Sequence, residues 1–233
     1  MMMHNHLSNI ELYYSTQKRN SGNEIILEEE EFRHAVQVMR NSVGETIYIT
    51  NGKGSIFRCE IISIENNSLL AKVLDEIKKE NKFANICFCI PRLKNPERLK
   101  FSIEKCVELG VTNFILFNSE RTISKFSKIE RWKKIALSAI KQSLHAYLPQ
   151  IKIVSSLDEI SELTGEKILL DQNAKHKFIF SNRRDKNYYF IFGPEGGLSE
   201  KEINLFEEAK ILSLGEYRLR SETAIVKCAS LLE

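Results

Sequence analysis

The sequence has no apolar run of roughly 18 residues, the length that a membrane-spanning helix requires. Residues 1–6 also lack the basic region and apolar core of a signal peptide, so we expect a cytoplasmic protein. The 5 cysteines do not show the two-residue spacing of paired zinc ligands, and the 5 histidines are scattered. We interpret the cysteines as buried thiols and expect no metal site.

The fingerprints of three large enzyme classes are missing as well. No Gly-x-Gly-x-x-Gly follows the first strand expected in the C-terminal part, where Pro91-Arg92-Leu93-Lys94 occupies the turn, and no Gly-x-x-x-x-Gly-Lys-Ser/Thr occurs anywhere. No Gly-x-Ser-x-Gly elbow presents a serine nucleophile. These absences argue against dinucleotide-binding, P-loop and serine-hydrolase chemistry.

The sequence has no large excess of positive or negative charge. Its 34 lysine and arginine residues and 31 aspartate and glutamate residues give a net charge of +3. A net charge of this size does not identify a partner. Its distribution is more informative, since basic residues crowd residues 121–152, with Glu130 as the acidic exception, and again residues 175–186. These stretches could form a stripe that faces phosphate groups, or they could be ordinary solvated surface charges.

Two parts of the chain follow different periodicities. After a short helix expected around 31–41, residues 46–50, 55–64 and 69–74 have the pattern of strands joined by turn-rich connections. A small β-barrel is expected here. The charged stretch 75–82 is the expected boundary, which divides the chain into domains of residues 1–75 and 76–233.

Strands and helices alternate from Ala84 onward, which is typical of a mostly parallel sheet covered on both faces. One helix is expected to begin at Pro96 after Asn95, and another at Ser127 with Glu130 as its capping partner. The expected strands are residues 85–90, 113–117, 151–154, 167–170, 188–192 and 211–214. The C-terminal domain is therefore predicted to be of the α/β class.

Two short stretches near the C-terminus carry the most information. Gly193-Pro194-Glu195-Gly196-Gly197-Leu198-Ser199 follows an apolar strand and precedes a helix that Ser199 opens, with Glu202 three residues later. Leu214-Gly215-Glu216-Tyr217-Arg218-Leu219-Arg220-Ser221-Glu222-Thr223-Ala224 repeats this order, and Ser221 is expected to cap a helix that starts at Glu222. A glycine turn between a strand and a helix lets a ligand approach the main chain closely, so two such corners could face one another.

These paired motifs resemble the ribosomal RNA small subunit methyltransferase E family of SPOUT-class enzymes. The family signature is a Gly-Pro-Glu-Gly-Gly turn followed by Leu-Gly…Leu-Arg-Thr-Glu-Thr-Ala, and Ser221 stands where most members have Thr. The resemblance extends to segments 34–40, 105–111 and 119–122. It implies a C-terminal SPOUT-type, mostly parallel sheet tied into a trefoil knot, and a small N-terminal PUA-like β-barrel that binds RNA.

The same resemblance implies the chemistry. The methyl donor would be S-adenosylmethionine (SAM), the acceptor N3 of a uridine in 16S ribosomal RNA of the small subunit, expected within an assembled subunit, and the protein would be a homodimer. The implied donor-binding residues are Leu170, Gly193, Glu195, Gly196, Gly197, Leu214, Gly215, Leu219, Arg220, Thr223 and Ala224. The candidate RNA-binding residues are Arg40, Arg92, Arg121 and Arg131.

Arg220 and Glu195 are the catalytic candidates. Arg220 could stabilise the negative charge that spreads onto the uracil oxygens when N3 loses its proton, or it could form a structural ion pair with Glu222 or Glu195. Glu195 could complement the sulfonium, act as the base, or accept hydrogen bonds within its own turn. Arg121 could contact an RNA phosphate or be a solvated loop charge.

Two alternatives remain open at this point. The chain could be a SPOUT methyltransferase for another ribosomal or transfer RNA nucleotide, or an RNA-binding protein without catalysis. One departure from the family concerns Leu144-His145, which stands where many members have Gly-Arg. An RNA contact made by that arginine in the family therefore has no counterpart here.

Overall fold

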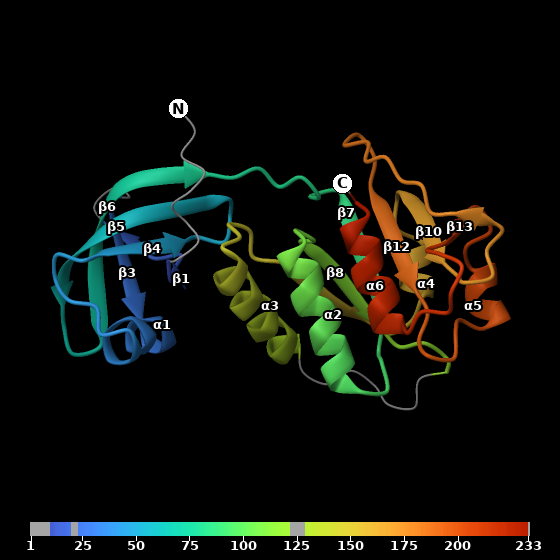
Figure 1. Ribbon diagram of the computed structural model, residues 1–233, viewed down its shortest axis with the longest axis horizontal. Helices are drawn as coiled ribbons and strands as arrows, with labels where there is room; N and C mark the ends of the chain where they lie inside the picture. Colours follow the sequence, from blue (N-terminus) through green and yellow to red (C-terminus); the bar gives the residue numbers. More distant parts are fainter. Residues whose placement is uncertain (1–9, 20–22, 122–128, 233) are drawn as a thin grey trace. The chain divides into compact units, whose positions relative to one another are not determined.

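The computed structural model describes residues 10–19, 23–121 and 129–232. The chain forms two compact units. Unit 1 comprises residues 1–81 and 140–148, and unit 2 comprises residues 82–139 and 149–233. Each unit has its own sheet (Figure 1).

Unit 1 is built on a curled six-stranded sheet with the order β1-β4-β5-β6-β3-β2. Neighbouring strands are antiparallel, except that β1 runs parallel to β4. The strands are β1 (Leu12–Tyr14), β2 (Lys18–Arg19), β3 (Glu24–Glu28), β4 (Thr46–Thr50), β5 (Ser55–Ile64) and β6 (Ser68–Lys78). The core between sheet and helix includes Leu27, Ile49 and Cys59, all fully buried.

Two expected strands of unit 1 are confirmed, whereas the bounds of the third strand and of the helix need correction. β4 and β5 have the predicted bounds. β6 does not end at residue 74, because Asp75–Lys78 continue the ladder opposite Ser55–Arg58, so the charged stretch begins as a strand. The helix expected around residues 31–41 begins two residues earlier, as α1 (Glu29–Arg33), and continues as a π-helical turn, η2 (His34–Val38), which ends at residue 38.

Residues 140–148 pack on the sheet of unit 1. Ala146 lies in an apolar cluster with Leu12 and Ile56, and its carbonyl oxygen accepts a hydrogen bond from the Gly54 N–H at 2.9 Å. Leu144 has a φ of +58°, in the left-handed region that glycine favours, and its side chain packs against the same cluster. The Leu-for-Gly departure from the family therefore combines a strained backbone position with an apolar contact.

Unit 2 confirms the α/β prediction. Its sheet has seven strands in the order β11-β13-β10-β12-β7-β8-β9, and every pair is parallel. The strands are β7 (Ile86–Pro91), β8 (Asn113–Phe117), β9 (Gln150–Val154), β10 (Glu166–Leu170), β11 (His176–Lys177), β12 (Tyr188–Phe192) and β13 (Lys210–Ser213). Parallel pairing brings the carboxyl ends of β10, β12 and β13 to one edge, where α/β sheets bind ligands.

The helices of unit 2 are α2 (Pro96–Glu108), α4 (Asp158–Ser161), α5 (Glu200–Asn204) and α6 (Ser221–Ser230), and α3 (Ile129–Ser143) begins in this unit. α2 begins at Pro96 as predicted, and Asn95 caps it, because the Asn95 side chain accepts a hydrogen bond from the Glu97 N–H at 2.9 Å. The predicted start of α3 at Ser127 lies outside the described residues. α2 and α6 lie side by side (Figure 1).

None of the helices in the described ranges is long and apolar enough to cross a membrane. Within the same ranges, no group of three His, Cys, Asp or Glu side chains could hold a metal ion.

Candidate functional site

A cavity of about 740 Å³ opens where β10, β12 and β13 end. Its walls come from the loops that follow these three strands and from the first residues of α2 and α6. Apolar side chains include Leu170, Leu198, Leu214 and Leu219, and main-chain groups of the glycine turn complete the surface. Both motif segments found in the sequence therefore line the same cavity.

The Gly193–Gly197 turn forms one wall. The Gly197 N–H donates a hydrogen bond to the Pro194 carbonyl at 2.9 Å. Gly197 has a φ of +71°, a backbone angle that residues with a side chain rarely adopt. A Cβ atom at Gly193 would lie 3.3 Å from the Gly197 Cα atom, so a larger residue there would press the turn apart. The positive φ favours glycine at position 197, and the close contact favours it at position 193.

Ser221 joins the two motif segments. Its hydroxyl donates a hydrogen bond to the Gly193 carbonyl at 2.8 Å. The prediction that Ser221 caps the last helix is wrong, because α6 begins at Ser221, and Arg220 occupies the cap position without a side-chain hydrogen bond. The hydroxyl instead fixes the start of α6 against the end of β12.

Glu202 links a third loop to the site, a role that the sequence analysis missed. This carboxylate is 4% exposed and accepts hydrogen bonds from Ser199 N (2.8 Å), Glu120 N (2.9 Å) and Ser119 Oγ (3.2 Å). The first contact completes the predicted capping box, and the other two hold the loop after β8. The next residue of that loop, Arg121, donates a hydrogen bond to the Gly196 carbonyl.

The two catalytic candidates have different surroundings. The Glu195 carboxylate accepts a hydrogen bond from the Lys94 N–H at 3.1 Å. It therefore contacts the loop after β7, whereas one of the alternatives for this residue was a hydrogen bond within its own turn. Arg220 forms no ion pair within the part of the chain that the structure describes. The alternative of an Arg220–Glu222 pair is not borne out, since Glu222 pairs with Arg98 at 3.4 Å.

Nearly all the predicted donor-site residues line the cavity; Thr223 is the exception and lies exposed on α6. Of the predicted RNA-binding residues, Arg121 lines the cavity as well. Arg131 pairs with Glu97 at 3.0 Å on the surface of unit 2. Arg92 follows β7, with its N–H bonded to the Phe117 carbonyl, and Arg40 is an exposed residue of unit 1 with a φ of +59°. Cavity residues that the sequence analysis did not select include Arg98, Asp171, Tyr217 and Arg218.

Two family models match the chain. A model described as an RNA methyltransferase domain matches residues 78–233, and one described as an RNA methyltransferase PUA domain matches residues 27–74. The chain belongs to the RNA methyltransferase family. The family resemblance found in the motifs is thereby confirmed, and the cavity lies wholly within the methyltransferase domain.

Individual relatives are similar to this RNA methyltransferase over most of its length. A protein named ribosomal RNA small subunit methyltransferase E from Aquifex aeolicus is 29% identical over 230 residues, which is 95% of this chain and 98% of the relative. The protein of the same name from Bacillus subtilis is 27% identical over 84% of each chain.

Solved structures agree with this assignment. The ribosomal RNA small subunit methyltransferase E of Neisseria gonorrhoeae, bound to S-adenosyl methionine, matches with a TM-score of 0.84 and 27% identity over 95% of each chain. A methyltransferase from Legionella pneumophila in complex with SAM matches with a TM-score of 0.82 and 25% identity, over 95% of this chain and 96% of that one.

The cavity of this RNA methyltransferase is rich in cationic side chains. Arg98, Arg121, Arg218 and Arg220 line it, against the carboxylates of Asp171 and Glu195. A site that combines apolar walls, exposed main-chain amides and an excess of guanidinium groups suits a ligand with an aromatic base and anionic oxygen atoms.

Proposed function

We propose that this RNA methyltransferase uses SAM to methylate N3 of a uridine in small-subunit ribosomal RNA. The observation that carries the proposal is the single cavity in which both motif segments meet, joined by the hydrogen bond from Ser221 to Gly193. The names of the relatives and the two SAM-bound structures support the donor and the RNA class. The choice of uridine N3 follows from the family resemblance of the motifs.

The cavity residues fit the donor. Leu170, Leu214 and Leu219 offer apolar surface for an adenine ring, and the Gly193–Gly197 turn presents main-chain groups that could read its edge. The main chain of this turn is accessible at the cavity wall, because Gly193, Gly196 and Gly197 have no side chain to cover it. We assign the donor to these residues together with Glu195, Gly196, Gly215, Arg220 and Ala224.

When bound, the sulfonium of the donor supplies the methyl carbon, which bonds to N3 while the carbon–sulfur bond breaks and its electron pair stays on sulfur. Before this step N3 must pass its proton to a base, for which the Glu195 carboxylate in the cavity is the candidate, and negative charge spreads onto the flanking uracil oxygens. Arg220 lines the cavity without an ion-pair partner among the described residues, so its guanidinium can stabilise this charge. Glu195 also holds the loop after β7, because its carboxylate accepts a hydrogen bond from the Lys94 N–H.

The remaining assignments follow from the substrate. We propose residues 1–75 as an RNA-binding domain and residues 76–233 as the methyltransferase domain, with Arg40, Arg92, Arg121 and Arg131 as contacts for RNA phosphates. We also propose that the protein works in the cytoplasm as a homodimer. Light scattering after size-exclusion chromatography tests the dimer, and a monomeric mass would contradict it.

Mapping of RNA methylation by mass spectrometry tests the proposed function. Small-subunit ribosomal RNA from cells that lack this protein should lose one methyl group at one uridine, and the wild-type gene should restore it. The R220Q variant should restore little of the mark, because loss of one charge-stabilising donor lowers turnover about 100-fold. The K201Q variant, which removes an exposed charge outside the cavity, is the control and should restore the mark fully. An unchanged map of ribosomal RNA contradicts the proposal, and a lost mark in transfer RNA redirects it.

A further inference from the structure

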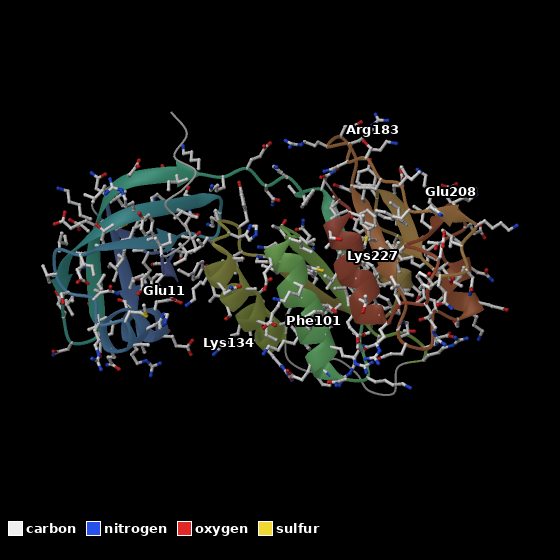
Figure 2. All side chains as sticks on the ribbon, in the orientation of Figure 1. Glu11, Phe101, Lys134, Arg183, Glu208 and Lys227 are labelled. Carbon is white, nitrogen blue, oxygen red and sulfur yellow. The ribbon has the colours of Figure 1, made fainter. Side chains whose placement is uncertain are left out.

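Arg98 lines the cavity from the first turn of α2, and a partly buried carboxylate from α6 pairs with it. The Arg98 Nε atom lies 3.4 Å from Oε1 of Glu222, and the two side chains are 36% and 12% exposed. The second oxygen, Oε2 of Glu222, is buried and accepts no hydrogen bond from the described residues. Figure 2 shows the side chains of these neighbouring helices, with Phe101 labelled on α2 and Lys227 on α6.

A pair made through Nε leaves the terminal nitrogen atoms of the guanidinium for another acceptor. Among the described residues, Glu222 is the ion-pair partner of Arg98, and no other carboxylate pairs with it. Arg121, by contrast, already donates to the Gly196 carbonyl. A guanidinium that lines a cavity, pairs with one carboxylate and has terminal N–H groups that no described residue uses is suited to bind an anionic oxygen group at two points.

We propose that Arg98 binds an anionic oxygen group of a ligand in the cavity and that Glu222 is its positioning residue. This inference rests on the proposed function, which supplies two sources of such a group: the methionine carboxylate of the donor and a phosphodiester of the acceptor RNA. Both offer paired oxygen atoms to the guanidinium fork. Neither Arg98 nor Glu222 belongs to the donor-binding set that the motifs indicate.

Calorimetric titration with two donor-site probes distinguishes the sources. S-adenosylhomocysteine carries a homocysteine carboxylate that corresponds to the methionine carboxylate of the donor, and 5′-methylthioadenosine lacks it. If Arg98 binds the carboxylate, the R98Q variant should bind S-adenosylhomocysteine at least about tenfold more weakly, with unchanged affinity for 5′-methylthioadenosine. If Arg98 binds phosphate, both affinities should stay unchanged, KM for the small-subunit RNA should rise by about tenfold, and the salt dependence of RNA binding should fall by about one charge.

The K100Q variant is the matched control. Lys100 lies on the same helix, two residues from Arg98, and pairs with Glu104 at 3.7 Å outside the cavity. Its loss removes the same charge from α2 and should leave both probes and the RNA kinetics unchanged. Equal behaviour of R98Q and wild type in every assay would overturn the proposal, as would equal losses in R98Q and K100Q.

A double-mutant cycle tests the role of Glu222. The E222Q variant should weaken the same ligand that R98Q weakens, by about three- to tenfold, and should have no further effect in the R98Q background. Additive losses would show that Glu222 acts through something other than Arg98. R98Q leaves a partly buried carboxylate without its cation. The double variant, and R98K, which keeps the charge but not the fork, therefore serve as folded comparisons.

The two proposals fail in different ways. A wild-type protein that binds neither probe contradicts the SAM-dependent function, whatever Arg98 does. The role of Arg98 is then decided by RNA binding alone, and an unchanged Kd and salt dependence in R98Q would refute it.

Discussion

The E202Q variant offers a close test of how the site is held together. Three donors converge on this buried carboxylate, and glutamine keeps only one acceptor oxygen. If the amide oxygen stays with Ser199 N and Ser119 Oγ, the amide NH₂ group faces the Glu120 N–H, and one charge-assisted hydrogen bond is replaced by two opposed donors. We expect unit 2 to lose about 1.5–3 kcal/mol of stability, the usual value of a hydrogen bond to a charged group.

Urea denaturation followed by the fluorescence of Trp132 measures this loss. Trp132 is the single tryptophan of the sequence, and its side chain is 6% exposed. It lies in the part of α3 that belongs to unit 2. With a slope of about 1–3 kcal/mol per molar urea, the midpoint should fall by about 1 M. The loop that carries Arg121 should also loosen, so the affinity for S-adenosylhomocysteine should fall several-fold.

The control is E200Q, which removes an exposed carboxylate from the first turn of the same helix. It should cost less than about 1 kcal/mol, because only the interaction with the helix dipole is lost. If E202Q matches E200Q in both midpoint and affinity, Glu202 does not hold the β8 loop in the way described.

Three further predictions follow from single contacts. The S221A variant should lose about 1 kcal/mol through its hydrogen bond to Gly193 and should bind S-adenosylhomocysteine more weakly in calorimetry; unchanged affinity would contradict the link between the motifs. The G54A variant should unfold unit 1 at a lower temperature than G44A, because a Cβ at Gly54 would overlap the Tyr147 hydroxyl, whereas a Cβ at Gly44 would meet no atom. Equal melting temperatures would refute the packing of residues 140–148. Burial raises the pKa of the Cys59 thiol to about 12, whereas the thiol of the unfolded chain ionises at about 8.5. The free energy of unfolding should therefore fall as the pH rises from about 8.5 towards 12. A C59A variant should show a smaller fall when urea titrations at pH 8 and pH 10 are compared.

Local sequence patterns predicted the elements that contain their own signals. The strand at 188–192 is a continuous apolar run ended by Gly193, and Asn95-Pro96 marks the start of α2, so both were identified at their observed positions. β1, β2 and β3 were missed, because strands of two to five residues with polar ends have no clear alternation. β3 owes its place to pairing with β6, about 45 residues further along the chain.

The sequence predicted the two motif segments of the site, together with Leu170 and Arg121, but not the contacts that join them. Glycine turns between strands and helices signal ligand corners, which is why nearly all the predicted donor-site residues line one cavity. Contacts between distant residues leave no local pattern. The bond from Ser221 to Gly193, the pair of Arg98 with Glu222, and the position of Glu202 under the β8 loop all needed the folded chain. The trefoil knot implied by the resemblance stays a prediction.

A crystal structure of the protein with S-adenosylhomocysteine tests the central claim most directly. The account predicts the adenosine moiety in the cavity between the Gly193–Gly197 turn and the Leu214–Leu219 segment, within hydrogen-bonding distance of main-chain groups of both. Density for the nucleoside elsewhere on the protein, or an empty cavity at saturating ligand, would contradict it.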